Sequence, residues 1–323
     1  MNTSEDAEQI ASRFTDLRKE MDRFVVGHEL VKTGLILGMV AREHIYIEGP
    51  PGMAKTMLAE IVSAASNLGF YLYQFHRDTR LAELVGDIVI QREQQGEDGE
   101  LIVQSIRRGG VLTAELCVLD DISRSPGEAL NVLLRILNER QFQEEPIPLL
   151  TAIATSNPTL DDYYNEPLDP ANLDRFTIQL RSAGLIHENQ WEKVRQVIDL
   201  YATPEFSREN IKPKATLSRA IFDEAYELLH QVRVPDNVKK ALIDLLSKFV
   251  NQYKLNPSNS LITDRSFLVK TVKILKAQAI LSGRIEVLPE DLHILPFVTT
   301  FRLPDEVNHV LPELIRDAIQ RVA

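Results

Sequence analysis

The chain has 323 residues, of which 44% are hydrophobic and 26% are charged, a composition typical of a folded globular protein with two subdomains. Its 36 Lys and Arg against 47 Asp and Glu give a net charge of -11, which argues against passive binding to nucleic acid or to an anionic membrane. The one cysteine excludes an internal disulfide, and no apolar run approaches the roughly 18 residues of a membrane helix. Because the first residues are acidic, unlike those of a signal peptide, we expect a cytoplasmic protein without a membrane span.

The predicted elements begin with a charged helix over about the first twenty residues, with Ile10, Phe14, Leu17 and Met21 on one face. Short β-type runs then alternate with helical stretches from about residue 45 to residue 180, which predicts a parallel sheet with helices on both faces. We expect five strands, at 45–48, 71–75, 116–119, 149–155 and 177–180. The run at 116–119 is apolar throughout, as is typical of a strand covered on both faces.

Two further patterns set the domain organisation. The apolar runs 88–90 and 101–103 flank a turn-rich segment at 96–99, which predicts a hairpin near 87–111 inserted into the α/β layer. After residue 180 the apolar residues recur with a helical period only. The sequence therefore predicts an α/β nucleotide-binding subdomain over 1–185, which includes the first helix, and an all-α subdomain over 186–323.

A glycine-bearing loop lies between the first predicted strand and a helical run that starts at Met57. Its residues are Gly49, Pro50, Pro51, Gly52, Met53, Ala54, Lys55 and Thr56. Such a loop wraps a β-phosphate with backbone N–H groups at a helix N-terminus, while the lysine adds a positive charge and the threonine hydroxyl ligates Mg²⁺. Ala54 stands where glycine is usual, and we expect it to fit if its dihedrals are right-handed helical. The alternative is a proline-glycine turn that precedes Lys-Thr by chance.

The predicted strand at 116–119 ends in two carboxylates. We assign Asp120 to Mg²⁺ and Asp121 to the attacking water. Hydrolysing enzymes of this kind usually carry glutamate at the second position; the missing methylene withdraws the carboxylate by about 1.5 Å, and a general base must lie within about 3 Å of its water. The sequence therefore leaves open that hydrolysis is slow. The alternative is that the aspartates cap the helix that follows.

Taken together, these segments resemble the MoxR family of AAA+ ATPases, and more closely its RavA-like branch. The resemblance covers nearly the whole chain and rests on 25–28, 49–56, 119–126, 131–142, 152–158, 173–176 and 263–266. It implies a P-loop AAA+ core followed by an all-α lid, with ATP and Mg²⁺ as cofactors. It also implies that the segment containing Val26 and Gly27 contacts the nucleotide base.

The resemblance implies three further site residues. Asn157, at the polar tip of a strand, would orient the water or touch the γ-phosphate; its alternative is a strand-end turn. Arg175 would reach the site of a neighbouring subunit, with a surface ion pair as the alternative. Arg265 would contact phosphate from the start of a lid helix. Arg124 and Arg140 are left open as other arginines acting on a neighbour.

The function implied is that of a hexameric ring that hydrolyses Mg-ATP and remodels a protein client, with a von Willebrand factor A domain protein as partner. The hairpin and the loop 77–87 would face the ring axis and touch the client, or the hairpin would be an oligomerisation edge. A nucleotide-gated scaffold with little hydrolysis is the alternative, because Asp121 is short. The negative charge disfavours a nucleic-acid motor, a lid helix has no evident use in a small-molecule kinase, and the histidine spacing predicts no zinc site.

Overall fold

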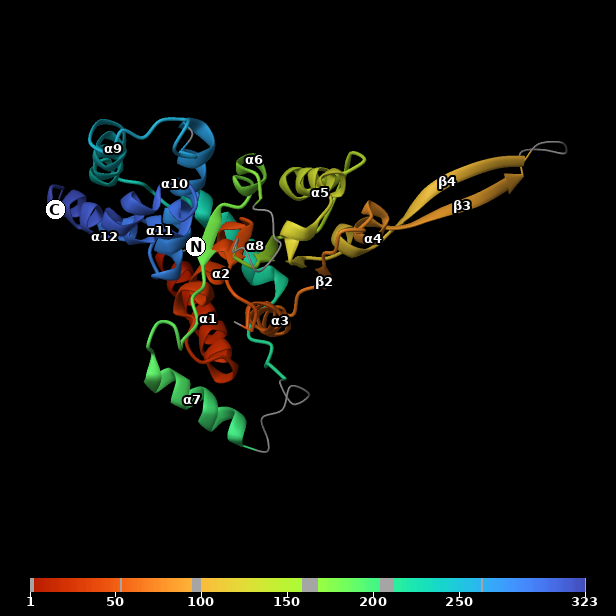
Figure 1. The fold of residues 1–323 in the computed structure, drawn as a ribbon, viewed down its shortest axis with the longest axis horizontal. Coiled ribbons are helices and arrows are strands. Elements are labelled where there is room, and N and C mark those ends of the chain that lie inside the picture. The colour runs from red at the N-terminus through yellow and green to blue at the C-terminus, as the bar shows by residue number, and fades with distance from the viewer. Residues whose placement is uncertain are drawn as a thin grey trace.

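The computed structural model describes residues 3–52, 54–94, 100–158, 168–203, 212–262 and 264–322. Its centre is a five-stranded parallel sheet with the strand order β2-β5-β8-β1-β9 (Figure 1). The strands are β1 (Ile45–Glu48), β2 (Phe70–Gln74), β5 (Leu116–Asp120), β8 (Thr151–Ser156) and β9 (Ile178–Arg181). All five predicted strands are confirmed, with ends displaced by one or two residues.

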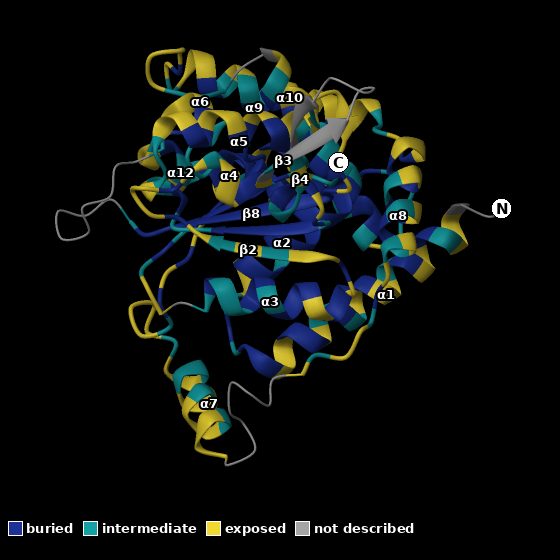
Figure 2. Ribbon diagram, turned by 90° about the vertical axis from the view of Figure 1, so that its right-hand side faces the viewer, coloured by how far each residue is buried: buried dark blue, intermediate teal, exposed yellow. Residues whose placement is uncertain are grey.

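The two faces of the sheet bury alternate residues of each strand. In β5, Leu116 and Val118 pack into one apolar cluster, whereas Cys117 and Leu119 pack into another on the opposite face. Helices cover both faces (Figure 2): α1 (Thr3–Phe24), α2 (Glu29–Ala41) and α3 (Lys55–Ser66) on the first, α4 (Leu81–Val85) and α5 (Gly127–Glu139) on the second. Burial on both faces explains why β5 is apolar throughout and raises the pKa of the Cys117 thiol.

The first helix joins the two parts of the molecule. The predicted apolar face of α1 is buried, and Phe14 meets Phe222 edge to face with ring centroids 5.4 Å apart. Phe222 belongs to a helix of the C-terminal part, and α1 also contacts α3 of the α/β part. A single apolar cluster therefore extends from the sheet through α1 into the C-terminal helices.

The predicted hairpin is present and extends from the core (Figure 1). It consists of β3 (Gly86–Gln94) and β4 (Glu100–Arg108), and its turn at 95–99 lies outside the described residues. Gly86 at its base has a φ of 113°, and a Cβ there would lie 2.1 Å from the carbonyl oxygen of Arg107. The base of the hairpin thus requires glycine. A second, very short antiparallel pair follows α5, formed by β6 (Gln141–Phe142) and β7 (Glu145–Pro146).

The C-terminal part is helical, as predicted. It contains α7 (Trp191–Ala202), α8 (Arg219–Gln231), α9 (Asp236–Asn251), α10 (Asp264–Leu281), α11 (Leu295–Thr299) and α12 (Asp305–Gln320). The short helix α6 (Pro170–Leu173) lies before β9 and belongs to the α/β part. Short 3₁₀ turns occur at Gly110–Leu112, Ile122–Arg124 and Pro289–Ile294. The boundary between residues 185 and 186 stays a prediction. Within the described part of the chain, every helix is too short or too polar to cross a bilayer.

Candidate nucleotide site

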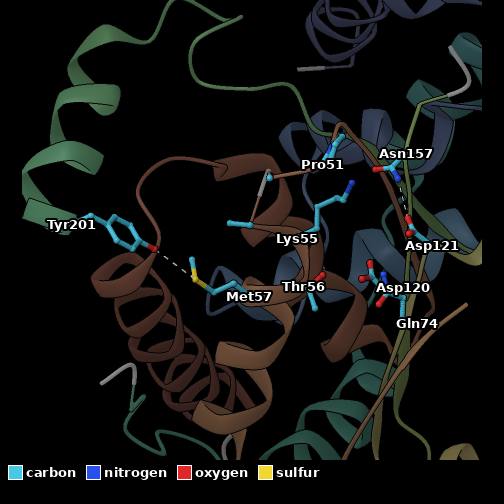
Figure 3. Close-up of a pocket in the computed structure, with 11 residues that line it drawn as sticks. Pro51, Lys55, Thr56, Met57, Gln74, Asp120, Asp121, Asn157 and Tyr201 are labelled. Carbon is cyan, nitrogen blue, oxygen red and sulfur yellow. Dashed lines mark hydrogen bonds between the residues drawn. The ribbon is translucent and has the colours of Figure 1, made fainter. Parts of the chain in front are cut away.

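The carboxyl ends of β1, β5 and β8 open into a cleft of about 500 Å³ (Figure 3). Its lining consists of Pro51, Gly52, Ala54, Lys55, Thr56, Met57, Gln74, Asp120, Asp121, Asn157 and Tyr201. The strand order reverses at β1, and ligands of open α/β sheets bind at such a switch point. The structure therefore brings together the loop residues, both aspartates and Asn157 that the sequence singled out. Met53 lies outside the described residues.

The loop before α3 is built on left-handed backbone. Gly52 has a φ of 82°, and Ala54, directly before the first residue of α3, has a φ of 54° and a ψ of 18°. The expectation of right-handed dihedrals at Ala54 is therefore wrong: the chain turns into the helix through a conformation that costs a non-glycine residue about 1–2 kcal/mol. This geometry explains why glycine is usual at that position. Gly49 is needed for space, because a Cβ there would lie 2.6 Å from the carbonyl oxygen of Ser182.

Lys55 points its ammonium back at the loop. It is 8% exposed and donates to the carbonyl oxygens of Gly49, Pro50 and Ser156, the last two at 3.3 Å. Burial lowers the pKa of Lys55, and the charges of Asp120, Asp121 and Glu48 oppose that shift. Among the described residues the hydrogen-bond acceptors of this ammonium are neutral carbonyls, and a cation so placed at a helix N-terminus fits a site for an anionic phosphate group.

Thr155 organises the acidic end of β5. Its hydroxyl donates to a carboxylate oxygen of Asp120 and accepts the backbone N–H of Asp121 at 3.3 Å. The Asn157 side-chain amide donates to Asp121 Oδ1 at 3.0 Å, and Arg124 Nε lies 3.8 Å from Asp121 Oδ2. Asp121 precedes a 3₁₀ turn without a side-chain capping bond, which does not support the helix-cap alternative. Sequence reasoning missed Thr155, although its place two residues before Asn157 puts both on one face of β8.

A second, apolar cavity of about 660 Å³ adjoins the first. The predicted base-contacting segment lines it with Val25, Val26 and His28, and the opposite wall comes from Leu185, Ile186 and α7. Pro51, Gly52, Ala54, Met57 and Tyr201 line both cavities. A polar cavity at the phosphate loop beside an apolar one matches the two ends of a nucleotide.

Two local features shape the apolar cavity. Gly27 has a φ of 76°, and a Cβ there would lie 2.7 Å from Leu185 Cδ2. The buried Lys32 donates to the carbonyl oxygen of Val25 at 2.6 Å and so fixes the turn. Burial lowers the pKa of His28, which favours a neutral ring at the cavity wall. The α7 wall, including Tyr201, was not predicted; its only signal in the sequence is a helical apolar period.

The candidate arginines lie outside both cavities. Arg175 lies half-buried in the turn between α6 and β9; its side chain forms no hydrogen bond or ion pair with any described residue, and its charge contributes to lowering the pKa of Glu139 at the end of α5. Arg265 is exposed in the first turn of α10, where Thr263 and the Asp264 side chain are not described. Arg140 donates to the carbonyl oxygens of Arg42 and Leu150, and burial lowers its pKa. These bonds direct Arg140 into its own chain.

A phosphate loop between β1 and α3, paired aspartates after β5, a polar residue after β8 and a helical C-terminal part define a P-loop protein of the AAA+ class. The family model described as the MoxR domain in the MoxR-vWA-beta-propeller ternary systems matches residues 12–218, and a model of the AAA lid domain matches residues 241–310. The chain therefore belongs to the MoxR family of AAA+ ATPases.

Individual relatives agree with this placement. An uncharacterised protein of Methanocaldococcus jannaschii, MJ0079, is 29% identical over 89% of this chain and 70% of its own length. The chaperone MoxR1 of Mycobacterium tuberculosis is 24% identical over 98% of this chain and 84% of its own. A solved structure of an ATPase candidate from Cytophaga hutchinsonii has a TM-score of 0.76 at 22% identity, over 99% of this chain and 97% of that one, and shares the fold.

Proposed function

We propose that this protein binds ATP with Mg²⁺ in the cleft at the carboxyl ends of β1, β5 and β8, and hydrolyses it as a ring. One observation carries the proposal. Lys55, Thr56, Asp120, Asp121 and Asn157 come from three separate segments of the chain, and all line one cleft. Such a convergence of a cation, a hydroxyl and two carboxylates at a helix N-terminus is what phosphoryl chemistry requires.

Each residue of the cleft has a chemical role in this proposal. The backbone of the loop from Gly49 to Met57 and the Lys55 ammonium hold the phosphates, while Val26 lines the base cavity and Gly27 forms the turn beside it, against Leu185. The oxygens of Thr56 and Asp120 are hard ligands suited to Mg²⁺, which neutralises phosphate charge when it is bound. Asp121 accepts the proton of the attacking water, and Asn157 orients the carboxylate and the water together.

The position of the candidate arginines outside the cleft supports a ring. Hydrolysis of this class needs a positive charge on the transferring phosphoryl group, and Arg175 lies outside its own cleft with a side chain unpaired among the described residues. We assign Arg175 to the site of the next subunit in a hexamer and Arg265 to the lid side of its own site. Arg124 is the remaining candidate to act on a neighbour, because Arg140 is bound within its own chain.

The proposed role of the ring is to remodel a protein client. The matched family model is described by its occurrence with von Willebrand factor A proteins, and one relative bears the name chaperone. These names support a client and a partner of those kinds; the RavA-like branch and a cytoplasmic location stay predictions. The projecting hairpin β3–β4 is the proposed client contact. Deletion of residues 91–100 should leave ring assembly and basal ATP turnover intact, whereas loss of assembly would indicate an oligomerisation edge.

The test is Mg²⁺-dependent ATP hydrolysis measured against protein concentration. Specific activity should rise with concentration, because each site needs a neighbour, and should vanish in Lys55→Ala and Arg175→Ala. Arg233→Ala is the matched control, since the Arg233 side chain is 75% exposed on the C-terminal part. Activity independent of concentration, or unaffected by Arg175→Ala, would contradict the ring mechanism.

A nucleotide-gated scaffold is the second candidate. The observation that favours it is the Asp121 carboxylate, which is shorter than the usual glutamate and is bonded to Asn157 at 3.0 Å. In such a protein ATP would promote assembly without turnover. Light scattering with and without ATP, beside the hydrolysis assay, separates the two candidates: assembly without hydrolysis supports the scaffold.

A further inference from the structure

The turn that carries Arg175 is held by side chains of the C-terminal helices. Asp174 ends α6, and its Oδ2 accepts hydrogen bonds from Ser266 Oγ at 2.9 Å and from Lys270 Nζ at 3.3 Å. Both donors lie on α10. The ammonium of Lys270 also donates to the backbone carbonyl of Asp174. Asp174, which directly precedes Arg175, is therefore bound to the long lid helix through both its side chain and its backbone.

Arg302 fixes the same turn from a second direction. It lies between α11 and α12 and is only 2% exposed. Its Nε donates to Asp174 Oδ1 at 3.2 Å, and its guanidinium donates to the carbonyl oxygens of Phe176 at 2.9 Å and Thr177 at 3.1 Å. Planar guanidinium groups make such multiple bonds with a fixed geometry. The backbone on both sides of Arg175 is therefore clamped by C-terminal residues, and the Arg175 side chain is left unpaired among the described residues.

This network links the two arginines that lie outside the cleft. Arg265 immediately precedes Ser266, whose hydroxyl binds Asp174, and Asp174 immediately precedes Arg175. A displacement of α10 that follows a contact of Arg265 with nucleotide must either move Asp174 or break the bonds that Ser266 and Lys270 donate to its carboxylate and its backbone carbonyl. Because bonds between charged groups in a partly buried network are strong, movement is the favoured response.

We propose that Asp174 is a positioning residue that couples the lid to Arg175, so that the arginine presented to the neighbouring subunit follows the position of α10. The inference rests on the proposed ring function. It adds that the lid and Arg175 are coupled within one subunit, and that Arg175 carries the effect to the site of the next subunit. The carboxylate of Asp174 transmits the shift, and the buried Arg302 makes the turn rigid enough to respond as a unit.

A mixed-subunit experiment tests this proposal separately from the ring mechanism. Asp121→Asn subunits keep the residues that bind the phosphates and keep Arg175 but cannot hydrolyse ATP at their own site, and Arg175→Ala subunits keep their own site but cannot complete a neighbour's. If Arg175 acts on a neighbour, each preparation alone is inactive and their mixture hydrolyses ATP. An inactive mixture would refute the proposed ring mechanism and the coupling with it.

The donor subunit is then changed to Asp121→Asn with Asp174→Asn, and the second change keeps the size of the side chain but removes its charge. We expect the restored activity to fall at least about tenfold, well within the 10³ to 10⁵ that such an arginine supplies. Because the donor's own site is already disabled, a role of Asp174 confined to its own subunit predicts full restoration. Full restoration would overturn the proposal.

Two matched donors distinguish coupling from a loosened fold. Asp291 is a buried carboxylate of the C-terminal part; it binds Arg284 at 2.6 Å and lies outside the Asp174 network. An Asp121→Asn donor with Asp291→Asn should restore activity as the plain donor does, and an equal loss with both donors would overturn the proposal. A donor with Ser266→Ala should lose part of the restored activity while Asp174 itself is intact; no loss would count against coupling through α10.

The homogeneous Asp174→Asn ring provides a second readout. A positioning role predicts a lower kcat with little change in the KM for ATP, because the loop, base cavity and metal ligands are untouched. A raised KM with unchanged kcat would place the effect on nucleotide binding and contradict the proposal. Thermal unfolding of Asp174→Asn and Asp291→Asn, measured side by side, shows whether the two variants are folded to the same extent.

Discussion

The Asn157 side-chain amide donates a hydrogen bond of 3.0 Å to Asp121 Oδ1, so the two polar residues proposed for hydrolysis restrain each other in the cleft. Arg124 lies 3.8 Å from the other carboxylate oxygen. The Asp121 carboxylate is held at both oxygens and stands on a short side chain. To take a proton from a water molecule, it must release Asn157 or Arg124, or the water must approach beside them. This relationship makes the length of residue 121 a determinant of the rate.

Lengthening that side chain should accelerate hydrolysis. Asp121→Glu extends the carboxylate by about 1.5 Å, and we expect kcat to rise by roughly 10- to 100-fold, because a well-placed general base contributes 10² to 10⁴. The measurement is Mg²⁺-dependent turnover at a protein concentration where the ring is assembled. Asp121→Asn, which cannot accept the proton, is the control and should be inactive. An Asp121→Glu protein slower than the wild type would show that the cleft is shaped for aspartate.

The left-handed backbone at Ala54 predicts a marked dependence on the side chain there. Ala54→Val should lower the free energy of unfolding by about 1–2 kcal/mol, because a β-branched residue is strained at a φ of 54°. Ala54→Gly should leave stability within about 1 kcal/mol, since relief of the strain is offset by the greater freedom of glycine in the unfolded chain. Urea unfolding of the three proteins measures both effects. Equal stabilities for alanine and valine would contradict the left-handed assignment.

The sequence predicts the sheet because each strand is a short apolar run, and it predicts the phosphate loop because that motif is local. It does not predict the dihedrals of Ala54, because an alanine at this position of the motif does not reveal whether the backbone is left- or right-handed. Nor does it predict contacts between distant segments. Tyr201 reaches the cleft from α7, and Arg302 binds Asp174 across 128 residues. Such pairings depend on how the helices pack, which no spacing along the chain encodes.

The base cavity depends on the absence of a side chain at Gly27. Gly27→Ala would place a methyl group 2.7 Å from Leu185 Cδ2 on a backbone with a φ of 76°, so we expect ATP affinity to fall about tenfold as Leu185 is displaced. Titration with a fluorescent ATP analogue measures the change. Gly127→Ala is the matched control, because a Cβ at Gly127 meets nothing within 4 Å and its site begins a helix. Unchanged affinity in Gly27→Ala would place the base elsewhere.

The buried His44 makes stability depend on pH. Its Nδ1 accepts the backbone N–H of Ala152 at 3.1 Å and its Nε2 lies 3.0 Å from the carbonyl oxygen of Leu137, so the neutral ring satisfies both partners. Burial lowers its pKa from 6.5 to about 4, with a further contribution from the charge of Arg140, while the bond to Leu137 and the charge of Glu43 oppose the shift.

Between pH 6.5 and about 4 the unfolded chain therefore binds a proton at His44 that the folded chain does not, and stability from this residue falls as the pH falls. The loss at pH 5 relative to pH 7.5 should be about 2 kcal/mol. Urea unfolding of the wild type and of His44→Gln at both pH values isolates the effect: the variant is less stable at pH 7.5 because it loses buried bonds, but its stability should fall less on acidification. His230→Gln, on the exposed end of α8, is the control and should keep the pH dependence of the wild type. An identical pH dependence in His44→Gln would show that folding does not lower the pKa of His44.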